Sequence, residues 1–137
     1  MSEDTQTAAA NPTAGAAAAA AKASLSEAVK LNPKQLAFFN RQLASMARLN
    51  MPLAKGLKIM AREVNEPQFR RLIESVQRDL EEGKSLQEAL GKYPESFGAI
   101  YIELLRAGET TGNLAVILEE LTRYNETLAR IRTRLRD

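Results

Sequence analysis

The sequence contains no cysteine and no histidine among its 137 residues. Their absence excludes thiol nucleophiles, disulfide bonds, cysteine and histidine zinc sites, and imidazole acid–base catalysis, and it fits a reducing compartment. Aspartate is scarce, with only Asp4, Asp79 and Asp137, so most acidic residues are glutamates, which tolerate helix interiors better. No pair of carboxylates stands in a context typical of acid–base catalysis, and we predict that the chain is not an enzyme.

The charge is nearly balanced, with 19 lysines and arginines against 17 aspartates and glutamates. Such a balance does not indicate a nucleic-acid-binding protein. Long apolar runs are absent as well, since none approaches the ~18 residues that suggest a membrane-spanning helix. The N-terminus also lacks the basic and leucine-rich regions of a signal peptide. The sequence therefore predicts a soluble chain with no nucleic-acid partner and no small-molecule substrate.

The first residues differ in character from the rest of the chain. Residues 1–23 contain eleven alanines, and Pro12 and Gly15 interrupt any helix there. Because no large apolar side chain offers a face to bury, we expect a disordered tail or linker. Large apolar residues appear at helical spacing from residue 24, where Ser24–Glu27 resembles a capping box. The expected division is a tail over 1–23 and a helical domain over 24–137.

Six helices are predicted from apolar periodicity and from start and stop signals. Asn32 is the expected N-cap of the first, with Pro33 at its first position, and Asn50 is the expected left-handed residue at its end. Gly83 is expected to end the third helix and Ser85 to cap the fourth. The predicted helices cover about 33–49, 53–64, 67–82, 85–91, 97–108 and 114–137. With no period-two alternation, the fold class is all-α, a bundle of about six antiparallel helices joined by short loops.

Residues 106–114 read RAGETTGNL, and two of its possible functions can be compared directly. A phosphate-binding loop requires a lysine after the second glycine and a strand before the first, and neither is expected here. As a turn, the segment places Gly108 just past the fifth helix and Gly112 where two helices nearly touch. Thr110 or Thr111 would cap the sixth helix, and Glu109 would lie at the positive end of its dipole.

A divalent-cation site is the remaining alternative for this segment. Glu103, Glu109 and Glu119 are expected near one end of the bundle. Threonine hydroxyls and turn carbonyls could complete the set of oxygen ligands that calcium prefers. Glu109 is the candidate metal ligand, and no other cofactor is expected.

Three segments carry a resemblance to a known family: FFNRQLASMARLNMPLAKGLKIMA, EEGKSLQEALGKYPESF and RAGETTGNLAVILEEL. In this order and spacing they resemble the type II secretion system F domain over about residues 34–136. Asn50 and Gly56 stand where the family often has glycine and alanine, and Thr111 replaces a common serine. The structural signature residues that match the family's motifs are Gln42, Leu43, Pro52, Leu53, Gly83, Ser85, Leu86, Leu90, Pro94, Phe97, Gly108, Glu109, Thr111, Gly112 and Leu114.

The resemblance implies a function that composition does not reveal. F domains are non-catalytic cytoplasmic domains of the polytopic inner-membrane platform proteins of type II secretion and type IV pilus systems. These proteins couple an assembly ATPase to the movement of pilins or pseudopilins. The implied partners are the assembly ATPase, other inner-membrane components of the machine and a second copy of the domain in a homodimer. The implied location is the cytoplasmic face of the bacterial inner membrane.

The last predicted helix carries arginines close to its apolar stripe. Arg132 and Arg136 fall near the side of the helix that holds Leu121, Leu128 and Leu135. Because a charge on a deeply buried face is unfavourable, we expect the helix to leave the bundle at about residue 131.

This helix end has two interpretations. With the family resemblance, we predict a core over 31–131 and a basic juxtamembrane stub over 132–137, followed by a membrane helix beyond Asp137. The alternative for the helix end is a frayed, solvated terminus. The alternative function for the chain is a free-standing helical adaptor that binds nucleic acid through its basic C-terminal helix.

Overall fold

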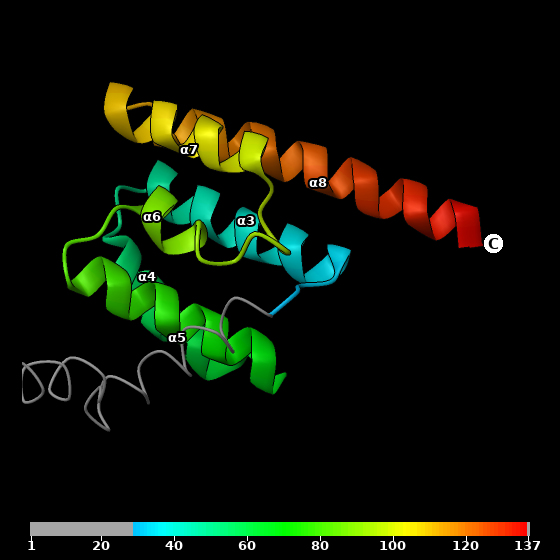
Figure 1. Cartoon of the computed structure of the whole chain (residues 1–137), viewed down its shortest axis with the longest axis horizontal. Helices are drawn as coiled ribbons and strands as arrows, with labels where there is room; N and C mark the ends of the chain where they lie inside the picture. The colour runs from blue at the N-terminus through cyan, green and yellow to red at the C-terminus, as the bar shows by residue number, and fades with distance from the viewer. Residues whose placement is uncertain (1–28, 137) are drawn as a thin grey trace, which may run out of the picture.

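The computed structural model describes residues 29–136, and this part of the chain contains six helices and no strand (Figure 1). The all-α prediction is confirmed for these residues. The predicted tail over 1–23 and the Ser24–Glu27 capping box lie outside them. The helices are α3 Pro33–Arg48, α4 Leu53–Glu63, α5 Pro67–Glu81, α6 Leu86–Leu90, α7 Ala99–Thr111 and α8 Leu114–Arg136.

Local capping signals define where the first helices begin and end. The Asn32 side chain accepts a hydrogen bond from the Gln35 amide at 2.8 Å, and the Gln35 side chain accepts one from the Asn32 amide at 3.0 Å. This reciprocal box, with Pro33 at the first helical position, confirms the predicted start of α3. Asn50 has φ 55°, the left-handed conformation predicted for the end of the helix.

The turn between α5 and α6 is also built as predicted. Gly83 has φ 91°, and the amides of Gly83 and Lys84 donate to carbonyls in the last turn of α5. Ser85 then accepts a hydrogen bond from the Glu88 amide at 3.2 Å and so caps α6. A left-handed glycine and a serine cap therefore connect α5 to α6 within four residues.

The helix α3 lies between two groups of helices (Figure 1). It packs against α8 on one side and against α4 on the other, α4 pairs with α5, and α7 pairs with α8. The short α6 contacts both α5 and α7. Aromatic rings occupy the centre, where the Phe39 ring lies 6.2 Å from Phe69 and 5.7 Å from Phe97 between centroids. Rings from α3, from α5 and from the segment before α7 thus meet in one common core.

The last two turns of α8 have little cover. Leu118 and Leu121 are buried, whereas the residues from Arg130 to Leu135 are exposed, with Leu135 at 80%. Figure 1 shows this end of α8 extending past the first turn of α3. The division into a core and a stub at residue 131 stays a prediction. Within the described residues, none of the helices combines the length and apolar character needed to cross a bilayer.

Two glycines at the junction of α7 and α8 have exchanged their predicted roles. Gly108 does not end its helix, because α7 continues to Thr111. A Cβ at Gly108 would lie 3.0 Å from Ile117 Cγ1 and 3.3 Å from Leu114 Cα, so this is the glycine that permits close approach of α8. Gly112 is the left-handed residue, with φ 75°, and its amide donates to the Gly108 carbonyl.

We predict that Gly112→Ala lowers the free energy of unfolding by about 1 kcal/mol, because a Cβ is strained at positive φ although no atom lies within 4 Å of it. Gly98→Ala is the matched control, since Gly98 also has open space but negative φ. Its stability should stay within about 0.5 kcal/mol of the parent. Urea unfolding measures both; equal losses in the two variants would contradict the assignment of strain to Gly112.

Candidate functional site

The Glu109 side chain of α7 binds the N-terminus of α6. Its Oε2 accepts a hydrogen bond from the Leu86 amide at 2.8 Å, and its Oε1 accepts one from the Gln87 amide at 2.9 Å. The first amides of a helix have no partner within the helix, and the helix dipole favours an anion there. We call this contact the Glu109 clamp. It joins the second signature segment to the third across 23 positions of sequence.

The prediction for Glu109 was therefore wrong in its partner. Glu109 was expected to complement the dipole of the following helix, which is α8, but it lies in the last turns of α7 and serves α6. The α7–α8 junction also has no threonine cap from Thr111, whose hydroxyl instead donates to the Ala107 carbonyl at 2.8 Å. Both differences follow from the extra turn of α7, which keeps Glu109 and Thr111 inside that helix.

The other signature residues divide into core and turn positions. Leu43, Leu86, Leu90, Phe97 and Gly108 are buried, and Leu114 packs against the core. Pro52, Gly83, Ser85, Pro94 and Gly112 lie at helix ends or in turns, while Gln42 and Leu53 are half-buried in α3 and α4. Direct contacts within the set join Glu109 to Leu86 and Gly112 to Gly108, and bring Gly108 against Leu114. Leu43, Leu86, Leu90 and Phe97 belong to one hydrophobic core.

The three glutamates considered for a metal site have different partners. Glu103 pairs with Arg106 at 3.5 Å, Glu119 pairs with Arg48 at 3.7 Å, and both oxygens of Glu109 accept amides. Within residues 29–136, no group of three acidic, cysteine or histidine residues could hold a metal ion. A calcium ion at Glu109 would compete with the amides that bind its carboxylate.

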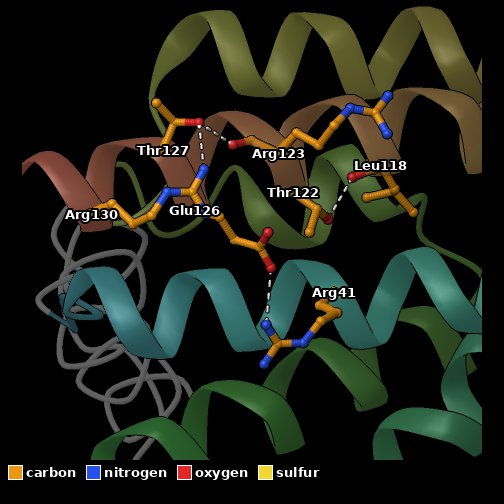
Figure 2. A network of polar contacts seen from close by, with 7 residues as sticks. All are labelled: Arg41, Leu118, Thr122, Arg123, Glu126, Thr127 and Arg130. Atoms are coloured by element: carbon orange, nitrogen blue, oxygen red, sulfur yellow. Dashed lines mark hydrogen bonds and ion pairs between the residues drawn. The ribbon is translucent and has the colours of Figure 1, made fainter.

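Two ion pairs connect α3 to α8. Arg41 pairs with Glu126 at 3.0 Å and Arg48 pairs with Glu119 at 3.7 Å. Seven residues separate the two arginines and seven separate the two glutamates, in opposite directions along the helices, so the pairs form the rungs of a ladder. Figure 2 shows Glu126 reaching from α8 to Arg41 on α3. Exposed pairs of this kind add little stability, about 0–1 kcal/mol each, but they record the register of the two helices.

Polar residues also lie inside the junction of α3, α7 and α8. The Tyr101 hydroxyl of α7 donates to the Asn40 side-chain oxygen of α3, and Asn40 is fully buried. On α8, Thr122 and Asn125 are buried as well. Among the described residues, the Nδ2 atoms of Asn40 and Asn125 have no hydrogen-bond partner. Burial raises the pKa of Tyr101 far above its ordinary value, so this phenol stays protonated as a donor.

The sequence interpretation missed these polar residues, although one signal was present. Asn40 lies four residues after Leu36 and three before Leu43, which places it on the apolar face of its helix. A polar residue on a buried face requires a hydrogen-bond partner. What the sequence does not reveal is that the partner would be Tyr101, which is 61 positions away.

Comparison with known proteins finds a matching family and related sequences. Residues 39–136 match the sequence profile of the family described as Type II secretion system (T2SS), protein F. The chain is 38% identical over 103 residues to Type IV pilus assembly protein PilC of Thermus thermophilus, covering 75% of this chain and 25% of that relative. It is 32% identical over 105 residues to Type II secretion system protein F of Vibrio cholerae, covering 77% and 26%. The chain therefore spans about a quarter of the length of these relatives.

We predict that Glu109→Gln lowers the free energy of unfolding by about 1–2 kcal/mol, because the amide keeps only one acceptor oxygen and no charge. Amide hydrogen exchange at Leu86 and Gln87 should become faster. Glu103→Gln is the matched control: its carboxylate is exposed and, within residues 29–136, pairs with Arg106 alone, so its loss should cost below about 0.5 kcal/mol. Equal exchange at α6 in both variants would argue against the Glu109 clamp.

We predict that Tyr101→Phe costs about 1–3 kcal/mol near neutral pH, because it leaves the buried Asn40 oxygen unpaired. The pKa of Tyr101 is raised by folding, so its stabilising contribution is present below the unfolded pKa of ~10 and is lost as pH rises above it. The stability difference between parent and variant should therefore shrink by about 1 kcal/mol between pH ~9.5 and ~11. A pH-independent difference in urea unfolding would contradict the raised pKa.

Proposed function

Because the chain belongs to the type II secretion system protein F family, we propose that it is a non-catalytic scaffold domain of a platform protein. This domain would act in type IV pilus assembly or type II secretion and couple an assembly ATPase to the movement of pilins or pseudopilins. The observation that carries the proposal is the family match over residues 39–136, which includes almost all of the three signature segments.

The packing of the described residues supports a mechanical role. The five-residue α6 is held to α7 by the Glu109 clamp, and α8 is held to α3 through buried side chains and ion pairs. Such contacts join consecutive and distant helices into one unit, which can transmit force without large internal rearrangement. Calcium binding by Glu109 is not required for this role.

The proposed location is the cytoplasmic face of the bacterial inner membrane, with a membrane helix beyond Asp137. The arginines near the end of α8 support this placement, because cytoplasmic segments beside membrane helices carry an excess of lysine and arginine. The domain would bind the assembly ATPase, other inner-membrane components and a second copy of itself. Exposed apolar side chains on α7, Ile100 and Leu104, offer surface for such contacts.

The reading frame downstream of codon 137 tests the membrane placement directly. We expect it to continue into an apolar stretch of about 20 residues. A stop codon immediately after Asp137 would contradict the platform-protein proposal.

Co-purification tests the coupling to an ATPase. A tagged copy of the full-length gene product should recover the hexameric assembly ATPase from cells, and deletion of residues 29–136 should abolish the recovery. Deletion of residues 1–23, the predicted tail, is the control and should leave recovery unchanged. Equal recovery of the ATPase after deletion of the helical domain would contradict the proposed coupling.

A further inference from the structure

The ladder between α3 and α8 lacks an acid at its next rung. On α3, the position seven residues before Arg41 is Lys34, and on α8 the position seven residues after Glu126 is Thr133. Lys34 and Thr133 line the same surface hollow. The register set by the Arg41–Glu126 and Arg48–Glu119 pairs therefore continues to this point. The cation of the third rung is present, but a threonine stands where the other rungs have a glutamate.

Further cations surround this hollow. Arg130 and Arg134 line it together with Lys34, Ala129 and Thr133, and no carboxylate is among these residues. Arg130 donates to the Thr127 hydroxyl at 3.3 Å, and within residues 29–136 none of the three cations forms an ion pair.

The one acid among the residues that line the adjacent hollow is already engaged. Glu126 lines the adjacent hollow with Lys34 and Arg130, but its carboxylate binds Arg41 (Figure 2). Like charges that gather without an acid repel one another. An external anion in the hollow would remove this repulsion and complete the ladder.

The surroundings of the hollow favour the surface of a membrane as the source of that anion. Ile131 and Leu135 lie on the same segment and are 46% and 80% exposed. Arginines next to exposed aliphatic side chains are typical of helices that lie at a membrane interface, with the cations at phosphate groups and the apolar side chains below them. Binding of nucleic acid would draw on the arginines but not on Ile131 and Leu135.

We propose that Lys34, Arg130 and Arg134 bind the phosphate groups of anionic phospholipids at the membrane surface, with Ile131 and Leu135 in contact with the acyl-chain boundary. The inference rests on the proposed function for its cytoplasmic-membrane setting. Under it, the end of α8 is a membrane-surface contact of the domain, and α3 contributes Lys34 to the same contact.

The experiment measures flotation of the 137-residue chain with vesicles of phosphatidylcholine, alone or with about one-third phosphatidylglycerol. We expect binding to the anionic vesicles only. Each cation at an anionic surface changes affinity roughly fivefold. The combined variant Lys34→Gln, Arg130→Gln, Arg134→Gln should therefore bind at least ~10-fold more weakly.

The matched control removes the same charges elsewhere: Lys58→Gln, Arg70→Gln, Arg71→Gln. These side chains are exposed on α4 and α5 and form no ion pair within the described part of the chain. The control should keep most of the binding, and urea unfolding checks that both triple variants are folded. An equal loss in the two triple variants would attribute binding to net charge and overturn the site.

A variant and a competitor separate a membrane from other sources of anions. Ile131→Ser with Leu135→Ser should weaken binding to the anionic vesicles, and inorganic phosphate at matched ionic strength should not displace them. Unchanged binding by the serine variant, displacement by free phosphate, or equal binding to neutral vesicles would each overturn the proposal.

Two further outcomes distinguish the lipid proposal from nucleic-acid binding and from the proposed scaffold function. Binding to duplex DNA that needs the three cations, without binding to anionic vesicles, would overturn the lipid proposal in favour of a nucleic-acid adaptor. Absence of vesicle binding, together with recovery of the ATPase by the full-length protein, would reject the headgroup contact and leave the scaffold function intact.

Discussion

The Glu109 clamp is the contact on which the middle of the fold depends. A helix of five residues is unstable alone because nucleation is costly and few hydrogen bonds repay it. In α6, the first amides are satisfied by the Glu109 carboxylate and the Ser85 hydroxyl, while Leu86 and Leu90 are buried in the core. The polar and apolar contacts of α6 thus hold it in one orientation. The position of α6 fixes how α5 approaches α7, because α6 contacts both.

The position of α7 in turn constrains where α8 and α3 lie. Gly108 lets α8 come close to α7, and the Tyr101 hydroxyl connects α7 to Asn40 of α3. The segment before α3 joins this group through Ser96, whose hydroxyl accepts the Leu31 amide at 2.9 Å. Each of these contacts joins different segments of the chain, so the folded state depends on the helices having assembled together.

The number of sequence positions between two interacting residues determines whether their contact could be predicted from the sequence. The caps at Asn32, Gly83 and Ser85 and the left-handed Asn50 were predicted correctly, because each depends on a few neighbouring residues. The partner of Glu109 was predicted wrongly, since it depends on which helix lies across the fold. The exchange of roles between Gly108 and Gly112 has another cause: apolar periodicity locates a helix but leaves its last turn uncertain. Among the contacts of the site, those between helices were the ones missed.

The two halves of α8 differ in a way that matters for the proposed transmission of force. Leu118 and Leu121 anchor the first half in the core, whereas residues 130–135 are exposed. A 23-residue helix is roughly 35 Å long and hard to bend. We therefore expect a displacement of the exposed end to move the other end of α8 as well, where Glu119 pairs with Arg48. The buried leucines resist movement of the first half of α8, whereas the exposed ion pairs contribute little free energy to holding the rest of the helix.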